Sequence, residues 1–564
     1  MNRMTGAEAF VRTLQAHGVK HIFGLCGDTS LPLYDALHRL DHGITHILTR
    51  DERHAGYMAD VYARVTGRVG VCEGPSGGGA TYILPGVVEA NESSIPILAV
   101  TTDISVTGRG RFTLTELDQE ALFRPLTKFN RVVDQAAQIP DTIRQAFREM
   151  TSGRPGAAHI GLPFDVQKAP VDEETVWGDE SLNAFPSRRA GADPAAIKAA
   201  ADALAAVSAP VIICGGGPVI AGAFDELRRV AEILEAPVAT SVSGQGIIAD
   251  DHPLAVGLVG SNGGVPETRA IVEAADLVMF VGCRAGSVTT ERWRYPKPGA
   301  VKIVHLDADG ATIGANYPTD VAVTGDAKLA LAALADELEG RMDKPPQRDL
   351  GRDAVAKAKA AKFETFEALA ASTDRPIRPE RVIKTLNDLM PSDGIIVGDP
   401  GTPCPYFSAF YRQNRPGRAF ISNRAHGALG FSMAGAMGAA IGRPDTKVVS
   451  VMGDGSFGMS CGEMETIVRL GLPITLVVFS NSVFGWIKAG QKTGFEERYF
   501  SVDFSRTNHA AVAEAFGFKT WRVEDPEDLE GALKQALEAG GPTLVDVVAQ
   551  ELNEAKAPVS EWVA

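Results

Sequence analysis

Two short apolar runs near residue 450 each end in small polar residues, and this pattern constrains the fold most strongly. The run 446–452, TKVVSVM, is rich in β-branched residues and is followed at once by the turn 453–456, GDGS. The run 473–479, PITLVVF, has the same character and leads to Asn481. Such runs predict buried strands of a parallel sheet, whose carboxyl ends share one edge. Open sheets of this kind bind ligands at that edge.

Apolar strand candidates alternate with helical segments along the whole chain of 564 residues, which predicts α/β architecture. A chain of this length is too long for one core, so we expect several domains. We predict three doubly wound, parallel-sheet domains at 1–167, 196–340 and 376–551, the second of them Rossmann-like. The predicted linkers are 168–195 and 341–375, and a C-terminal tail follows at 552–564.

Charge and apolar content exclude two classes of partner. The formal net charge of −15 argues against sequence-independent binding to nucleic acid or to an anionic membrane surface. The chain contains no apolar stretch long enough to cross a bilayer and no segment typical of a signal peptide. Its six cysteines are scattered without a CxxC pair, which favours reduced thiols. We therefore expect a cytoplasmic protein that acts on a small molecule.

The turn 453–456 has the chemistry of a site for a phosphate and a divalent cation. Gly453 and Gly455 let backbone amides approach phosphate oxygens, and a helix expected at about 461–470 adds its N-terminal dipole. Asp454 supplies a hard oxygen ligand of the kind that Mg²⁺ prefers. The alternative interpretation is an ordinary strand-to-helix turn.

This turn, together with Asn481, resembles the motif of enzymes that bind thiamine diphosphate (ThDP). In that family the Asp, the Asn and a backbone carbonyl two residues beyond the Asn bind magnesium, which implies these roles for Asp454, Asn481 and Val483. The family often has two consecutive Asn residues, and Ser480 replaces the first of them here. The segment GDPGTP (398–403) resembles a further diphosphate contact. The cofactor contacts implied are Gly401, Thr402, Gly453, Asp454, Gly455, Ser456, Asn481 and Val483.

A second segment, 49–71, resembles the family region that activates ThDP. The resemblance makes Glu52 the acid that hydrogen-bonds the aminopyrimidine ring, and burial should raise its pKa. A carboxylate that stabilises a helix N-terminus is the simpler interpretation of Glu52. The segment 426–442 resembles the one that supports the bent cofactor, and Met433 is our candidate for that support. A Met in a tightly packed helix is the alternative.

The resemblance covers nearly the whole chain. The order of pyrimidine-binding, central and diphosphate-binding domains resembles acetolactate synthase, which implies a lyase or transferase: a 2-oxo acid decarboxylase or carboligase. The family dimerises head to tail, so Glu52 of one chain would meet Asp454 of another in a homodimer or homotetramer.

Substrate positions differ from those of the synthase. Thr115 stands where the synthase has Gln, and Gly490 where it has a bulky Trp, while Trp486 is shifted toward the helix start. We therefore keep alternatives of similar architecture: a 2-hydroxyacyl-CoA lyase, oxalyl-CoA decarboxylase, sulfoacetaldehyde acetyltransferase or benzaldehyde lyase. The candidate substrate contacts are Cys26, Gly27, Thr115, His426, Phe484 and Trp486.

The central domain has a glycine run at 215–217, where relatives bind FAD or an ADP group such as that of coenzyme A. Arg284 and Asp307 are candidate nucleotide contacts, and an empty domain is equally consistent with the sequence. A nucleotide oxidoreductase without ThDP and a non-catalytic regulatory subunit are rival functions. Two further candidates remain open: His54 as a proton-transfer group beside His426, and Trp562 as part of a lid.

Overall fold

The computed structural model describes residues 3–342 and 345–562. The first two residues of the predicted first domain, residues 343–344 of the second linker and the last two residues of the tail lie outside these ranges. The described chain forms three six-stranded sheets in which every neighbouring pair is parallel, and a short antiparallel pair of β1 (Arg3–Thr5) and β8 (Pro170–Asp172). This confirms the predicted α/β class. Within the described ranges, no helix is both long and apolar enough to span a membrane.

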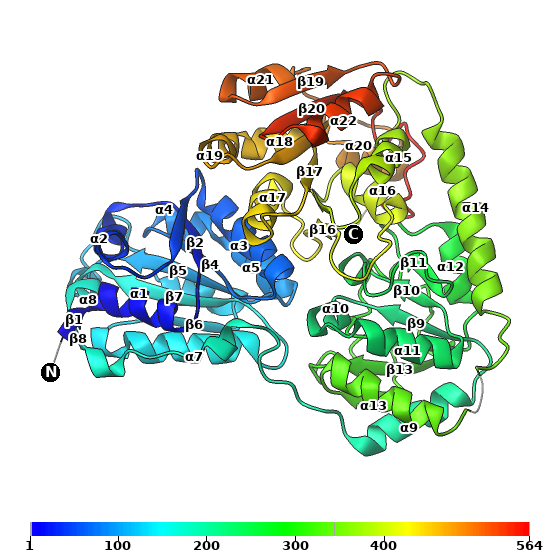
Figure 1. Ribbon diagram of the computed structural model, residues 1–564, viewed down its shortest axis with the longest axis horizontal. Coiled ribbons are helices and arrows are strands. Elements are labelled where there is room, and N and C mark those ends of the chain that lie inside the picture. The colour runs from blue at the N-terminus through cyan, green and yellow to red at the C-terminus, as the bar shows by residue number, and fades with distance from the viewer. Residues whose placement is uncertain (1–2, 343–344, 563–564) are drawn as a thin grey trace. The chain divides into compact units, whose positions relative to one another are not determined.

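The first sheet has the strand order β3-β2-β4-β5-β7-β6. Its core lies against α1 and α7 on one face, and α3 and α5 cover the other (Figure 1). The elements are β2 (His21–Gly24), β3 (Thr45–Leu48), β4 (Gly70–Gly74), β5 (Ile97–Asp103), β6 (Phe129–Val132), β7 (Ala158–Pro163), α1 (Gly6–Ala16), α2 (Leu31–Arg39), α3 (Glu52–Thr66), α4 (Gly78–Tyr82), α5 (Leu84–Glu92), α6 (Gln119–Phe123), α7 (Ile139–Thr151) and α8 (Phe164–Lys168).

The second sheet has the order β11-β10-β9-β12-β13-β14. One apolar core joins it to α9, α11 and α13, and a second core joins its other face to α12 and α14 (Figure 1). The elements are β9 (Pro210–Cys214), β10 (Val238–Thr240), β11 (Ala255–Leu258), β12 (Leu277–Val281), β13 (Lys302–Asp307), β14 (Val321–Thr324), α9 (Pro194–Ala205), α10 (Gly217–Ala221), α11 (Phe224–Leu234), α12 (Pro266–Glu273), α13 (Ala327–Glu339) and α14 (Arg352–Ala370).

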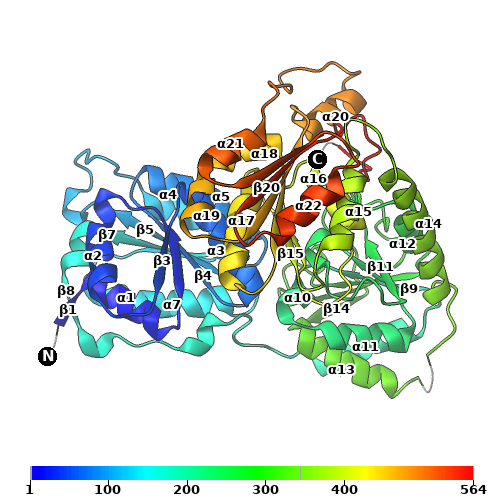
Figure 2. The ribbon, with the colours of Figure 1, turned by 45° about the horizontal axis from the view of Figure 1, so that its top comes forward.

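The third sheet has the order β16-β15-β17-β18-β20-β19. Helices α15, α16 and α22 contribute to one apolar core with it, and Figure 2 shows them grouped together. The elements are β15 (Ile395–Gly398), β16 (Phe420–Ser422), β17 (Val448–Gly453), β18 (Ile474–Ser480), β19 (Lys519–Val523), β20 (Thr543–Val548), α15 (Pro379–Leu389), α16 (Pro403–Phe410), α20 (Gly485–Gly494), α21 (His509–Phe516) and α22 (Leu529–Glu538).

Internal packing divides the chain into two units. Unit 1 combines the residues up to Arg188 with 423–445 and 460–472, and unit 2 contains the rest. Unit 1 therefore includes α17 (Phe431–Gly442) and α19 (Met464–Arg469), which come from the predicted third domain. In unit 1, α17 packs so closely on α3 that a Cβ at Gly438 would lie 2.2 Å from the Met58 carbonyl oxygen.

The helix after the GDGS turn starts earlier than the sequence suggests. We expected it at about 461, but α18 (Asp454–Ser460) begins at Asp454, directly after β17, and a 3₁₀ turn at Cys461–Glu463 separates it from α19. Gly and Ser have low helix propensity, so this segment resembles a turn in sequence. Burial of Phe457, which is 3% exposed, accompanies the helical geometry.

Candidate active site

Asp454 ties the ends of two neighbouring strands together in unit 2. Its Oδ2 accepts hydrogen bonds from the backbone amides of Asn481 (2.8 Å) and Ser482 (2.6 Å), and its Oδ1 accepts one from Gly455 (2.9 Å). The strands β17 and β18, which end here, are parallel neighbours. Burial raises the pKa of Asp454 although these amides act in the opposite direction. The structure thus brings Asp454 and Asn481 together at one sheet edge.

The residues at this edge fit a magnesium ion and a diphosphate. Asn481 Nδ2 is buried and has no hydrogen-bond partner in the described part of the chain. A Cβ at Gly453 would meet nothing within 4 Å, whereas one at Gly455 would lie 2.6 Å from Phe484 Cε1. Gly453 therefore borders open space, and Gly455 makes room for Phe484. A carboxylate, an amide and the Val483 carbonyl are hard oxygen donors, which suit Mg²⁺.

The other predicted cofactor contacts of unit 2 lie along the same edge. Gly401 and Thr402 follow β15, the neighbour of β17, and precede α16. Thr402 is buried, and its Oγ1 lies 3.4 Å from the point that a Cβ of Gly485 would occupy at the start of α20. Ser456 is buried in the first turn of α18.

Sequence reasoning missed a buried polar network behind Asn481. Ser480 Oγ donates to Asp546 and lies 2.7 Å from His509 Nδ1. The His509 amide (3.0 Å) and the Arg522 guanidinium (2.7 Å) donate to the other Asp546 oxygen. Burial opposes ionisation of Asp546, but the hydrogen bonds from His509 and Ser480 prevail and lower its pKa. Ser480, the departure from the family motif, anchors the strand end that presents Asn481.

Glu52 is the first residue of α3 in unit 1 and is 6% exposed. Two glycines make room for it: a Cβ at Gly74 would lie 3.1 Å from Glu52 Cγ, and one at Gly79 would lie 3.1 Å from its Oε1. Burial raises the pKa of Glu52, as expected for this position. A carboxyl group with a raised pKa keeps its proton at higher pH, and a protonated carboxyl group is able to donate a hydrogen bond.

The remaining candidates of unit 1 differ in exposure. His54 is buried, with Nδ1 3.1 Å from Glu463 Oε1, and this pairing gives it a structural partner far along the chain. His426 is exposed, and its backbone amide donates to Glu89 (2.7 Å). Met433 is fully buried in α17, the helix that packs on α3.

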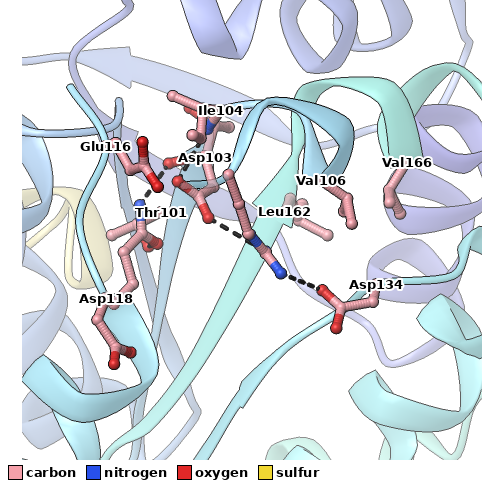
Figure 3. Close-up of polar contacts among 12 residues, drawn as sticks. Thr101, Asp103, Ile104, Val106, Glu116, Asp118, Asp134, Leu162 and Val166 are labelled. Atoms are coloured by element: carbon pink, nitrogen blue, oxygen red, sulfur yellow. Dashed lines mark hydrogen bonds and ion pairs between the residues drawn. The ribbon is translucent and has the colours of Figure 1, made fainter. Parts of the chain in front are cut away.

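Thr115 lies in a braced loop between β5 and α6. Arg109 bridges Asp103 at the end of β5 (3.3 Å) and Asp134 after β6 (2.7 Å) (Figure 3). Glu116 accepts backbone hydrogen bonds from the same loop, including one of 2.5 Å from Gly110. Burial raises the pKa of Asp103 although Arg109 lies beside it. The loop therefore has a defined conformation.

Hydroxyl groups connect this loop to the turn beneath Glu52. Thr115 Oγ1 lies 2.7 Å from Ser76 Oγ, which lies 3.2 Å from Thr29 Oγ1. Thr115 has a φ of 69°, and a Cβ at Gly77 would lie 2.8 Å from Thr115 Cβ. Cys26 and Gly27 follow β2, and Cys26 is exposed. Gly27 lies close to the turn that contains Ser76, because a Cβ at Gly27 would collide with Pro75.

The tail contacts α20 in unit 2. Trp486 and Trp562 have ring centroids 5.2 Å apart, and the Trp486 indole donates to the Trp562 carbonyl (3.2 Å). A Cβ at Gly490, where the synthase has Trp, would lie 3.9 Å from Trp562 Cβ. Trp562 therefore borders the space beside Gly490.

The glycine run of the central domain has a packing role. A Cβ at Gly215 would lie 2.2 Å from the Gly282 carbonyl oxygen, and one at Gly217 would lie 2.7 Å from Gly282 Cα. Arg284 is exposed after β12, and Asp307 is half-buried at the end of the neighbouring β13. These two residues share a sheet edge, and their contact with a nucleotide remains a prediction.

Three family models of protein domains match the chain, one for each of the three sheets and in the same order along the sequence. Residues 4–122 match the N-terminal TPP binding domain of thiamine pyrophosphate enzymes, residues 197–334 the central domain, and residues 399–547 the C-terminal TPP binding domain. The chain belongs to the thiamine pyrophosphate enzyme family. It is a ThDP-dependent enzyme that resembles acetolactate synthase.

Full-length relatives show the same relationship. The chain is 35% identical over 558 residues to a probable acetolactate synthase large subunit of Methanococcus aeolicus, covering 96% of this chain and 92% of that protein. It is 36% identical over 554 residues to the protein of that description from Methanocaldococcus jannaschii (97% and 92% covered). Acetolactate synthase isozyme 3 large subunit of Escherichia coli is 32% identical over 541 residues (95% and 93% covered).

Proposed function

We propose that the protein is a magnesium- and ThDP-dependent enzyme that forms or cleaves a carbon–carbon bond next to a carbonyl, with a 2-oxo acid as donor. The observation that carries this proposal is that the chain has both a buried acid, Glu52, in unit 1 and a sheet edge in unit 2 where Asp454 and Asn481 meet. The acetolactate synthase relatives support the same reaction class.

Each group then has a task. When bound, ThDP supplies a nucleophilic thiazolium carbon. Asp454, Asn481 and the Val483 carbonyl hold magnesium, and the amides near Gly453 bind the diphosphate. Glu52 holds a proton toward the aminopyrimidine ring, and its burial lets it keep that proton. Met433 supports the cofactor from an apolar helix.

Reconstitution tests the cofactor assignment. Calorimetry with ThDP and MgCl₂ should show binding to the wild type, and Asp454→Asn should weaken it. Glu52→Gln should keep binding but slow exchange of the thiazolium proton, because the proton held by Glu52 is lost. Wild-type protein that does not bind ThDP with magnesium would contradict the proposal.

Substrate assays separate the reaction types. Carbon dioxide release from pyruvate without coenzyme A supports the 2-oxo acid donor. Turnover of an acyl-CoA compound, a benzoin-type ketone or sulfoacetaldehyde instead would assign the enzyme to one of the related lyases or transferases.

We also propose that the active protein is a homodimer or homotetramer with sites shared between chains. Refolding equal amounts of Glu52→Gln and Asp454→Asn together should restore roughly a quarter of wild-type activity. About half of the dimers would be mixed, and one of the two sites in each mixed dimer would be intact. Two inactive variants that stay inactive when refolded together would place both residues of a site on one chain.

A further inference from the structure

A buried carboxylate from a distant part of the chain holds the backbone on both sides of Glu52. Glu463 lies in the 3₁₀ turn before α19, is 0% exposed and belongs to unit 1, as Glu52 does. Its Oε1 accepts a hydrogen bond from the Arg50 amide (2.8 Å) and lies 3.1 Å from His54 Nδ1. Arg50 is two residues before Glu52, and His54 is two residues after it. One oxygen atom therefore joins the turn after β3 to the first turn of α3.

Both oxygens of the Glu463 carboxylate accept hydrogen bonds. Thr466 Oγ1, in α19, donates to Glu463 Oε2 (2.8 Å). Because a carboxylate only accepts hydrogen bonds, His54 donates from Nδ1. Burying a carboxylate is costly unless donors replace the lost water. The three donors supply that replacement, and two of them come from the residues that flank Glu52.

Two further contacts of the same region lie along the chain before Glu52. Arg469 in α19 donates to the Leu48 carbonyl at the end of β3 (2.6 Å) and to Glu465 in its own helix (3.0 Å). A Cβ at Gly462 would lie 3.9 Å from Arg50 Cβ. The 3₁₀ turn and α19 therefore line the chain from the end of β3 into the turn that follows it.

The surroundings of Glu52 make the position of its backbone important. Glycine backbones approach its side chain closely, because a Cβ at Gly74 would lie 3.1 Å from Glu52 Cγ and one at Gly79 would lie 3.1 Å from Glu52 Oε1. The direction of the carboxyl group therefore depends on where the start of α3 lies. Misplacement of a reacting group by about 1 Å costs on the order of 10²-fold in rate.

We propose that Glu463 is a positioning residue that fixes the start of α3 and thereby directs the Glu52 carboxyl group. The inference rests on the proposed function for the task of Glu52, donation of a hydrogen bond to the cofactor. The donors to Glu463 are a backbone amide, a hydroxyl and an imidazole, and none of them needs a charged acceptor. The position therefore requires an oxygen that reaches Arg50 and His54.

Two substitutions separate reach from charge. Glu463→Asp keeps the charge but withdraws the oxygens by one methylene, whereas Glu463→Gln keeps an amide oxygen within reach of Arg50 and His54. Hydrogen exchange of residues 49–55 is measured in the full-length protein without cofactor. Glu463→Asp should speed this exchange roughly tenfold or more, because lost hydrogen bonds favour local opening. Glu463→Gln should stay within about threefold of the wild type.

Ile143→Ala is the control for general destabilisation. Ile143 is 0% exposed in α7, which covers the opposite face of the first sheet from α3. Its truncation should speed exchange in α7 and leave residues 49–55 as in the wild type. The proposal is overturned by unchanged exchange of 49–55 in Glu463→Asp, by equal increases in Glu463→Asp and Glu463→Gln, or by an equal increase in Ile143→Ala.

A second measurement distinguishes positioning from a purely structural role. With ThDP and magnesium at saturation, Glu463→Asp should slow exchange of the thiazolium proton roughly tenfold or more, because Glu52 is displaced. Its ThDP affinity, measured by calorimetry, should stay within about threefold of the wild type, and Glu463→Gln should keep the wild-type exchange rate. A wild-type rate in Glu463→Asp, or a parallel loss of affinity and rate, overturns the proposal. Wild-type protein that binds no ThDP contradicts the proposed function instead, and exchange of residues 49–55 still decides whether Glu463 fixes the turn.

Discussion

Single residues decide the local chemistry, and several could not be assigned from the sequence. The roles expected for Asp454 and Asn481 require only that two strand ends meet, which apolar patterning predicts. Glu73 lies in a short strand, GVCEG, whose pattern gives no sign that its carboxyl is buried. The pairing of His54 with Glu463 joins residues far apart in the sequence, so it depends on tertiary structure.

At the residue scale we predict that Ser480→Ala destabilises the protein and weakens magnesium-dependent ThDP binding. The substitution removes the hydroxyl that bonds Asp546 and His509, and leaving such buried groups unpaired costs about 1–3 kcal/mol. Urea unfolding without cofactor measures the loss. Ser450 on the neighbouring β17 is the control, since its buried hydroxyl has no partner within the described chain. Ser450→Ala should be neutral or stabilising, and equal losses in both variants would contradict the role of the network.

At the scale of elements, strand positions were largely predictable but helix contacts were not. The runs 446–452 and 473–479 agree with β17 and β18 within one or two residues. Both faces of a parallel sheet are covered, so each buried strand is a nearly continuous apolar run in the sequence. Such a run therefore predicts the position of the strand. The start of α18 depends on tertiary packing that overrides low intrinsic propensity.

Close approach of α17 to α3 predicts a large effect of one methyl group. Gly438→Ala should lower the free energy of unfolding by about 1–3 kcal/mol, because its Cβ would lie 2.2 Å from the Met58 carbonyl. Gly531→Ala in α22 is the control, since nothing lies within 4 Å of its Cβ. That substitution should stabilise the helix by up to about 1 kcal/mol. Chemical denaturation measures both, and a neutral Gly438→Ala would show that α17 shifts without cost.

Helix α14 contains a buried lysine that predicts a pH dependence of stability. Burial lowers the pKa of Lys362 to about 8, and its ammonium lies 5.3 and 5.7 Å from the ring centroids of Phe363 and Phe410. Because an exposed lysine titrates near 10.4, the unfolded chain binds more protons between these pH values. The contribution of Lys362 to the free energy of unfolding therefore rises with pH in that window, by up to about 3 kcal/mol.

The comparison of Lys362→Met with wild type isolates this contribution. Relative to the variant, the wild type should gain stability as pH rises from 7 to 10, measured by urea denaturation at each pH. Lys357→Met, at an exposed position of the same helix, should keep the wild-type dependence. A constant difference between wild type and Lys362→Met over this range would contradict the assignment.

At the scale of the whole molecule, the sequence predicts three sheets, while packing groups the chain into two units. The segments 423–445 and 460–472 group with the residues up to Arg188, with α17 packed on α3, although in sequence they fall between strands of the third sheet. Sheet membership follows from local apolar runs. Grouping of distant segments depends on contacts such as Gly438 against Met58, which one sequence does not reveal.

Within unit 2 the C-terminal tail contacts both the central sheet region and α20. We predict that these contacts slow hydrogen exchange in both regions. Glu561 pairs with Arg292 (3.3 Å) and Arg294, and the Ser560 amide donates to the Ser261 carbonyl (3.1 Å). Beyond these contacts, Trp562 packs on Trp486 at the start of α20. Glu561→Gln should therefore loosen the contact of the tail with the region of Ser261 and its contact with α20.

Hydrogen exchange should show faster exchange in residues 260–264 and in the first turn of α20, because loss of the Glu561 pairs lowers the free energy of local opening. Glu554→Gln, at an exposed tail position, is the matched control and should leave both regions unchanged. Faster exchange in 260–264 alone would show that the tail is held at α20 by Trp562 without help from Glu561. Unchanged exchange in both regions would show that the ion pairs do not fasten the tail.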